Sequence, residues 1–387
     1  MSFPLSNRLN KLPPYLFAAI DAKKKAAIEK GADIISLGVG DPDLPTPKHI
    51  VEAGKRGLEN PANHQYPFGS GLGSFRSAVA GWYEARFGVC LDPETEIHSL
   101  MGSKDGLTHL PLAFLNPGDL VLIPEPAYPA YNAAVALAGG LSHFIPLLEK
   151  NNFLPDFSMV SKDVLTSAKF LFLNFPGNPT SAVAPRPFFE SVVKLAKEYG
   201  FFVAHDAPYS EMYYEDPPVS FLSVPGAREV GVEFHSCSKT YNMTGWRIGW
   251  VCGNRDVVRG LGRLKDNYDS GTFQAVQEAA IGALSGPQDC VVEMRKTYKA
   301  RRDFFVPALS RLGWQVFNPP ATFYVWAQTP LGYSSSKAAE RLLDEAHIVC
   351  TPGNGFGPSG EGYLRFALTV PLERLTQAIA RMEKVKW

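Results

Sequence analysis

The sequence predicts an α/β fold in which a large domain, built on a mostly parallel sheet covered by helices, is joined to a smaller α+β domain. Strand and helix patterns alternate from about residue 97 to 240, as in α/β domains. The segment KFLFLNF at 169–175 is almost continuously apolar, which is typical of a parallel strand buried on both faces. The last hundred residues combine long helical patterns with further strands. We therefore predict an arm (1–45) that packs with the small domain, a large domain (46–286) and a small domain (287–387).

The composition is that of an ordinary enzyme rather than of a nucleic-acid-binding or secreted protein. Lys plus Arg and Asp plus Glu number 38 each, without an arginine-rich tract, so we expect no nucleic-acid partner. The five cysteines form no C-x-x-C pair, which argues against disulfides and structural zinc and favours a reducing compartment. No window reaches about 18 uninterrupted apolar residues, and the N-terminus has no long apolar signal core. We expect a cytoplasmic protein with no membrane segment and no bound metal.

The N-terminal arm combines a helix with a strand and a turn. The pattern predicts a helix from Leu16 to Lys30 and a strand from Ile34 to Val39, followed by the proline-rich turn GVGDPDLPTP. Gly40 in that turn either lets a ligand approach the backbone or is an ordinary turn glycine. Tyr15, beside two prolines, is either a surface anchor or a substrate contact.

A glycine loop follows the first helix of the large domain. The helical pattern VEAGKRGLEN leads to HQYPFGSGLG, which contains Tyr66, and a helix is then predicted from Ser74 to Phe87. The glycines loosely imitate a dinucleotide-binding loop, but no apolar strand precedes them. We therefore do not predict a dinucleotide site.

Polar and aromatic residues follow the first two predicted strands of the sheet. The strand at 97–101 runs directly into a helix that begins at about Lys104, so the backbone N–H groups of Ser103 and Lys104 could face an anion. The alternative is an ordinary serine-capped helix. The strand at 119–123 leads into PEPAYPAY, whose prolines hold Tyr128 where its ring could stack on a flat ligand, or simply pack.

The next two strands also end in polar residues. Asn178 follows the strand at 169–175, and the strand at 201–206 ends in Asp206, with Tyr209 three residues on. Asp206 either caps the turn or is a buried charge with a cationic partner. Ligands of parallel sheets bind at the carboxyl ends of the strands. By this rule we expect one ligand site at the strand ends, formed by Ser103, Tyr128, Asn178, Asp206 and Lys239.

The segment EFHSCSKTYNMTGWRIGWV surrounds one lysine with hydroxyl groups and an arginine. Ser236 and Ser238 precede Lys239, Thr240 follows it, and Arg247 lies eight positions downstream. The hydroxyls and the arginine can bind one dianionic phosphate, while a lysine of lowered pKa can attack a carbonyl to form an imine. This combination predicts a site for pyridoxal phosphate. The alternative, a lysine on a solvated loop, does not account for these neighbours.

The remaining patterns complete the large domain and form the small one. RIGWVCGN is predicted to be a strand and 257–286 helical, followed by the helix EMRKTYKARRDFFVPALSRLG and the strands TFYVWAQ and GYLRFAL. Arg365 in the last strand either faces solvent or offers its planar fork to a substrate carboxylate.

With these residues assembled, the chain resembles the class I and II aminotransferases, pyridoxal-phosphate enzymes with the aspartate aminotransferase fold, over nearly its whole length. The resemblance is carried by Asn178-Pro179-Thr180, by Asp206 with Tyr209, by the lysine segment and by YLRFAL. It implies that Lys239 forms the imine and then serves as the base, and that Asp206 pairs with the pyridine nitrogen.

The same resemblance implies roles for the other candidates. Tyr209 and Asn178 would hold the phenolic oxygen of the ring, on which Tyr128 stacks. The phosphate would lie among Ser103, Lys104, Ser236, Ser238 and Arg247. Tyr66 would reach that phosphate across the interface of a homodimer with shared active sites, and Arg365 would bind the substrate α-carboxylate.

Within the family the chain looks most like the LL-diaminopimelate aminotransferases, which act in lysine biosynthesis with 2-oxoglutarate as amino acceptor. PPYLF, GVGDPDLPTP, SKTYNMTGWRIG and TPGNGFGPSGEGYLRFALTVP carry this likeness. It implies that substrate contacts come from Tyr15, Gly40, Lys104, Tyr128, Asn178 and Arg365. The partners would then be an amino acid and a 2-oxo acid.

Two positions depart from the pattern. The family usually reads NNPTG where this chain has Gly177 and Ser181, and the branch usually has a glutamate for the distal ammonium where this chain has Ser70. An aminotransferase for alanine, aspartate or a similar amino acid is therefore an alternative, as is a β-lyase on the same fold. A non-catalytic regulator is disfavoured because Lys239 is present and no added DNA-binding domain is recognisable.

Overall fold

The computed structural model describes residues 3–12, 23–26, 28–29 and 31–387. The predicted helix from Leu16 to Lys30 falls partly outside these ranges. Its described residues, 23–26 and 28–29, are helical. Tyr15 lies outside the described residues.

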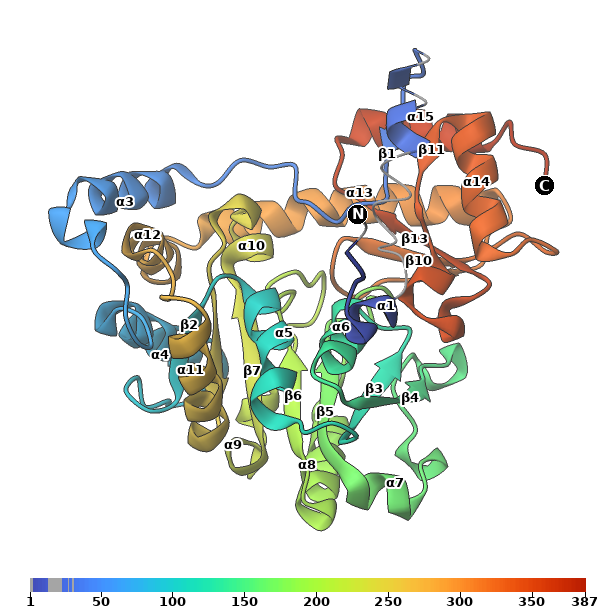
Figure 1. The fold of residues 1–387 in the computed structure, drawn as a ribbon. Helices are drawn as coiled ribbons and strands as arrows, with labels where there is room; N and C mark the ends of the chain where they lie inside the picture. Colours follow the sequence, from blue (N-terminus) through green and yellow to red (C-terminus); the bar gives the residue numbers. More distant parts are fainter. Residues whose placement is uncertain (1–2, 13–22, 27, 30) are drawn as a thin grey trace.

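A seven-stranded sheet forms the centre of the larger unit, in the order β2-β8-β7-β6-β5-β3-β4 (Figure 1). Only β8 runs against the others, since it pairs antiparallel with both of its neighbours. The carboxyl ends of the other strands therefore share one edge. The strands are β2 (Ile97–Leu100), β3 (Leu120–Glu125), β4 (Leu141–Pro146), β5 (Ala168–Asn174), β6 (Phe202–Asp206), β7 (Gly231–Ser236) and β8 (Gly249–Gly253).

Helices cover both faces of this sheet because alternate strand residues point to opposite sides. In β5, Phe170 and Phe172 pack with residues of α5, α6 and α11, whereas Leu171 and Leu173 belong to the core that includes α4 and α8. The apolar run predicted to be a doubly covered parallel strand is confirmed. The helices of this unit are α3 (Lys48–Glu59), α4 (Gly73–Phe87), α5 (Ser103–Phe114), α6 (Ala130–Leu137), α7 (Lys162–Ser167), α8 (Arg186–Tyr199), α9 (Ala227–Val230), α10 (Cys237–Thr240), α11 (Arg255–Tyr268) and α12 (Gln274–Ser285).

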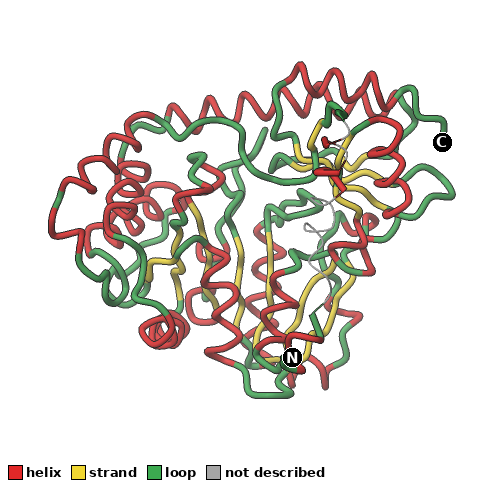
Figure 2. The backbone as a smooth tube through the Cα atoms, turned by 45° about the horizontal axis from the view of Figure 1, so that its top comes forward, coloured by secondary structure: helices red, strands yellow, loops and turns green. Residues whose placement is uncertain are grey.

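A smaller unit is built on an antiparallel sheet in the order β12-β13-β10-β9. The long helix α13 leads from α12 to this unit, and Figure 2 shows its strands as a group separate from those of the large sheet. β1 of the arm pairs parallel with β11. The elements are α1 (Asn7–Asn10), β1 (Ile35–Ser36), α13 (Asp289–Arg311), β9 (Val316–Phe317), β10 (Tyr324–Gln328), α14 (Ser335–Ala346), β11 (Ile348–Val349), β12 (Thr351–Pro352), β13 (Tyr363–Ala367) and α15 (Leu372–Met382).

The predicted fold class is confirmed, but several elements differ from the prediction. The strand predicted from Ile34 to Val39 is limited to β1 (Ile35–Ser36). The stretch 257–286, predicted to be helical, is two helices, because α11 ends at Tyr268 and Gly271 adopts a φ of +92°. The sequence pattern did not indicate β4, whose residues alternate little in polarity and are mostly half-buried or exposed. The domain boundaries near residues 45 and 287 stay predictions. Among the described helices, none has the length and apolar character needed to cross a membrane.

Candidate active site

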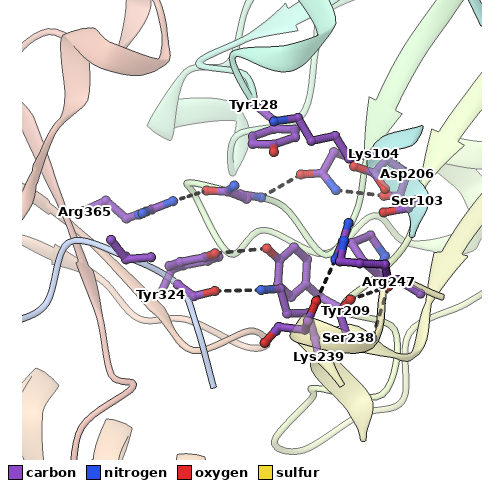
Figure 3. Close-up of a pocket in the computed structure, with 17 residues that line it drawn as sticks. Ser103, Lys104, Tyr128, Asp206, Tyr209, Ser238, Lys239, Arg247, Tyr324 and Arg365 are labelled. Atoms are coloured by element: carbon purple, nitrogen blue, oxygen red, sulfur yellow. Dashed lines mark hydrogen bonds between the residues drawn. The ribbon is translucent and has the colours of Figure 1, made fainter. Parts of the chain in front are cut away.

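A cavity of about 390 Å³ opens where the carboxyl ends of the parallel strands meet the smaller unit (Figure 3). Arg365 and Tyr324 reach it from one side, and Ser103, Ser238 and Arg247 from the other. The structure brings most of the predicted site residues together here. They are Gly40, Ser103, Lys104, Tyr128, Asn178, Asp206, Tyr209, Ser236, Ser238, Lys239, Arg247 and Arg365.

Lys239 lies on the short helix α10, which begins where β7 ends. The Ser236 hydroxyl accepts a hydrogen bond from the Ser238 N–H at 3.1 Å and so caps the helix. The Lys239 ammonium donates to the carbonyl oxygen of Gly40 at 2.7 Å. Burial lowers the pKa of Lys239 to about 8, with Asp41 opposing this shift and Arg365 and Arg247 adding to it. The neutral, nucleophilic amine is therefore accessible near neutral pH.

Asp206 ends β6 and is only 4% exposed. Its Oδ2 accepts a hydrogen bond from the Tyr131 hydroxyl at 2.6 Å, but its Oδ1 has no hydrogen-bond partner among the described residues. Burial raises the pKa of Asp206 to about 7, although Tyr131 and His205 act to lower it. A buried carboxylate oxygen without a donor fits a cationic N–H group supplied by a ligand.

An anion cradle lies at the start of α5. Gly102 has a φ of +82°, and a Cβ there would lie 2.5 Å from Nη2 of Arg247, so the glycine lets the guanidinium come close. Arg247 donates to the carbonyl oxygens of Thr244 at 2.8 Å and Met101 at 3.3 Å. The hydroxyls of Ser236 and Ser238 lie 2.8 Å apart beside it. Hydroxyls, one guanidinium and a helix N-terminus are the donors that a phosphate needs.

Arg365 on β13 is 1% exposed, so the alternative of a solvent-facing strand arginine is wrong. Its Nη1 donates to Oδ1 of Asn178 at 2.7 Å, and its Nη2 donates to the carbonyl oxygen of Gly38. Its guanidinium lies 4.3 Å from the centre of the Tyr324 ring. The planar fork is thus held rigidly in the wall of the cavity.

Sequence reasoning missed Tyr324 and Asn174. The Tyr324 and Tyr209 hydroxyls lie 3.0 Å apart, and a Cβ on Gly40 would lie 2.0 Å from the Tyr324 oxygen. The sequence gives no sign of these contacts, because Tyr324 begins β10 of the smaller unit. Asn174 could have been found, since it ends β5 just as Asp206 ends β6. Its amide donates to the Asp206 carbonyl oxygen at 2.8 Å, and its Oδ1 accepts from the Asn178 N–H.

The departure at Ser181 has a local explanation. Ser181 adopts a φ of +62°, a region that favours glycine. Its buried hydroxyl lies 2.6 Å from that of Thr322 and donates to the carbonyl oxygen of Tyr324 at 2.8 Å. These bonds connect the loop that carries Asn178 to β10. These hydrogen bonds therefore offset the strain of a serine at a φ that favours glycine.

Of the predicted site residues that the structure describes, Tyr66 is not in the cavity. Tyr66 is 72% exposed, and the centre of its ring lies 5.6 Å from that of Phe68. Its role across a dimer interface stays a prediction. The glycine loop with Ser70 does not line the cavity either. The Ser70 carbonyl oxygen accepts a hydrogen bond from the Ser99 N–H at 3.0 Å, which ties the loop to β2.

The donors and acceptors of the cavity fit pyridoxal phosphate. An amine of lowered pKa, a buried carboxylate oxygen without a donor and a cradle of hydroxyls with one arginine line the same space. Tyr128 lies beside Lys104, whose Nζ is 6.0 Å from the centre of its ring.

Comparison with known proteins gives one consistent result. Residues 32–382 match the family model described as aminotransferase class I and II. The chain is 55% identical to an LL-diaminopimelate aminotransferase of Syntrophobacter fumaroxidans, with 100% of both chains covered. It is 53% identical to the enzyme of that name from Aquifex aeolicus, with 99% of this chain and 100% of the other covered. A solved aspartate aminotransferase mutant of Thermus thermophilus superposes with a TM-score of 0.93 at 30% identity, with 100% of both chains covered.

Proposed function

The chain belongs to the class I and II aminotransferases, which use pyridoxal phosphate, and we propose that it transfers the amino group between LL-diaminopimelate and 2-oxoglutarate. The observation that carries this proposal is the convergence of Lys239, Asp206 and the buried Arg365 on one cavity. The names of the full-length relatives at 53–55% identity support the choice of substrate.

When bound, pyridoxal phosphate supplies a ring that accepts the electrons left at the substrate Cα after its proton is removed. Asp206 would hold the ring nitrogen protonated, because a cationic N–H beside its free Oδ1 would stabilise the carboxylate against the effect of burial. Arg247 and the hydroxyls of Ser236, Ser238 and Ser103 would hold the phosphate. Tyr209 and Asn178 would hold the phenolic oxygen, and Tyr128 would pack against the ring.

Lys239 moves the proton. Its amine would attach the cofactor to the chain, and when free it would remove the proton from the substrate Cα. A base whose pKa is about 8 is mostly protonated at pH 7 but exchanges protons readily there. The Gly40 carbonyl oxygen, 2.7 Å from Nζ, orients this amine.

Arg365 orients the substrate. Its fork binds the α-carboxylate, so that the Cα proton faces Lys239. The Asn178 and Gly38 oxygens and the Tyr324 ring hold the guanidinium in place before substrate arrives. Gly40, Lys104 and Tyr15 add substrate contacts in this proposal.

An aminotransferase for a small or neutral amino acid is the second candidate, and Ser70 is the observation that favours it. Without a carboxylate at this position in the glycine loop, the distal ammonium of diaminopimelate lacks the partner that the branch usually supplies. The protein is proposed to act in the cytoplasm as a homodimer with shared active sites. The scattered cysteines and the implied role of Tyr66 support these two points.

A single-turnover screen of the purified holoenzyme tests the proposal. We expect LL-diaminopimelate to change the visible absorbance of the bound cofactor faster than alanine, aspartate or glutamate does. If only the smaller amino acids react, the substrate assignment is wrong and the aminotransferase activity stands. Release of pyruvate and ammonia without any 2-oxo acid would indicate a β-lyase. The Lys239→Ala variant serves as the inactive control.

A further inference from the structure

A second cavity, of about 520 Å³, lies apart from the active site and shares no lining residue with it. It opens between α4, the end of α12, the start of α13 and the segment 211–213. Two arginines, one glutamate and two large aromatic residues line it. They are Arg86, Arg295, Glu211, Trp82 and Tyr213.

The two guanidinium groups converge on a single carboxylate. Nε of Arg86 donates to Oε1 of Glu211 at 2.7 Å, and Nη1 of Arg295 lies 3.6 Å from Oε2. Both arginines also lie against the Tyr213 ring, with Arg295 4.3 Å and Arg86 5.6 Å from its centre. Two positive charges and one negative charge leave an excess positive charge in this wall of the cavity.

Most of the donors on these arginines are unused within the described part of the chain. Each guanidinium has five N–H donors. Arg86 donates one hydrogen bond, from Nε, and Arg295 donates none to the residues that the structure describes. One terminal nitrogen of each, Nη2 of Arg86 and Nη1 of Arg295, is buried and makes no hydrogen bond there, although the latter lies 3.6 Å from Glu211. Buried arginine donors normally have partners, so a ligand with acceptor oxygens would complete the site.

The rest of the lining is mainly apolar and aromatic. Trp82, Leu284 and Val291 face the same cavity, together with small residues of α4. A bare inorganic anion would leave this surface in water, whereas an organic acid would cover it. We propose that this cavity binds a small organic carboxylate with an apolar body, held by Arg86 and Arg295. This site goes beyond the proposed transamination.

The site adjoins the segment that carries an active-site residue. Glu211 and Tyr213 follow Tyr209 by two and four residues, and Tyr213 forms an isolated bridge with Ala321 just before β10. Arg295 belongs to the helix that leads to the smaller unit. A bound carboxylate therefore contacts elements that lead to both sides of the active site.

Fluorescence titration of the holoenzyme with benzoate tests the proposal, with Trp82 as the internal probe. We expect saturable quenching that is lost in Trp82→Phe. Arg86→Gln and Arg295→Gln should each weaken binding at least about tenfold, because each removes a charged donor. Arg365→Gln should leave the quenching unchanged, which separates this site from the substrate site.

Glu211→Gln gives the decisive contrast. It keeps both arginines and removes the carboxylate that competes for them, so benzoate should bind more tightly than in the wild type. If Glu211→Gln instead weakens binding as much as the arginine variants do, those residues only maintain the local packing, and the proposal is wrong.

A second measurement does not depend on any variant. Crystals of the holoenzyme soaked in 4-bromobenzoate should show a bromine anomalous peak between Trp82 and the two arginines. The absence of both this peak and saturable quenching in the wild-type protein would overturn the proposal.

Discussion

At the residue scale, burial of the Asp206 carboxyl lowers the stability of the cofactor-free protein at neutral pH. Burial raises its pKa from 3.8 to about 7, so the cofactor-free folded protein binds a proton that the unfolded chain releases above about pH 4. Stability of the cofactor-free protein must then fall as pH rises from about 4 to about 7. In the proposed complex, a cationic ring nitrogen beside Asp206 would reverse this penalty.

The Asp206→Asn variant isolates this effect. Between pH 5 and pH 8, the unfolding free energy of the cofactor-free wild type should drop by about 2–3 kcal/mol more than that of the variant. Urea unfolding of both proteins at the two pH values measures the difference. All other titrating groups are shared, so equal slopes would contradict the raised pKa.

Ser181 allows a second prediction about a single residue. Replacing it with alanine removes the buried hydrogen bonds to Thr322 and the Tyr324 carbonyl oxygen while keeping the unfavourable positive φ. We expect Ser181→Ala to lose about 1–3 kcal/mol of unfolding free energy. Ser181→Gly should lose less, because glycine adopts this φ without strain. Thermal unfolding of the two variants tests this order, and an equal loss would show that the strain is negligible.

Residues within contiguous motifs were predictable, and residues brought in by tertiary structure were not. Lys239 and Arg247 share one segment with their hydroxyl neighbours, and Asp206 ends an apolar strand. Tyr324 comes from the smaller unit and carries no local signal. Its place beside Tyr209 depends on how the two units pack.

At the scale of elements, a buried ion cluster connects α11 to the start of α5. Lys265 is 1% exposed and donates to Asp105 at 2.6 Å and to Asp269 at 2.8 Å. Burial would raise the pKa of Asp105, but the nearby His109 ring and Lys265 ammonium bring it down to about 2. Asp105 also accepts from the Met101 N–H, directly before the anion cradle. The cluster therefore supports the loop proposed to hold the phosphate.

The Lys265→Met variant should be strongly destabilised. Removing one partner leaves buried carboxylates without their cation, which costs about 3–5 kcal/mol. Lys55→Met is the matched control, because Lys55 makes a salt bridge with Glu52 in which both side chains are largely exposed. The control should lose less than about 1 kcal/mol. Chemical unfolding measures both, and similar losses would contradict the importance of burial.

The strength of the local sequence pattern explains which elements were predictable. Long helices and continuous apolar strands have strong sequence signals, and α4 and β5 begin and end close to the predicted residues. β4 lies at the edge of the sheet, where its exposed residues weaken the pattern. The break between α11 and α12 depends on Asp269, which accepts the Gly271 N–H and pairs with Lys265, a contact that periodicity does not record.

At the scale of the whole molecule, the cavity forms where two sheets meet. Strand ends of the parallel sheet supply Asp206 and the lysine segment, while the antiparallel sheet supplies Arg365 and Tyr324. The rule that ligands bind at the carboxyl ends of parallel strands located the first group from sequence alone. The second group required the packing of the smaller unit against the larger.

The exposure of Tyr66 leads to a prediction about the assembly. If Tyr66 reaches the phosphate site of a partner subunit, each complete site combines Lys239 of one subunit with Tyr66 of the other. A Tyr66→Ala variant should then hold the cofactor about ten- to a hundredfold more weakly, through loss of a hydrogen bond to a charged group. Lys239→Ala should be inactive. Each variant therefore lacks a different one of the two residues that a complete shared site needs.

Mixing the two variant chains distinguishes a shared site from independent ones. In a random mixture, half of the dimers contain one chain of each kind, and each such dimer has one site with both residues intact. At limiting cofactor, the mixture should regain about a quarter of the wild-type activity after the chains are unfolded and refolded together. Since neither residue can replace the other within one chain, independent sites would give no more than the average of the two variants.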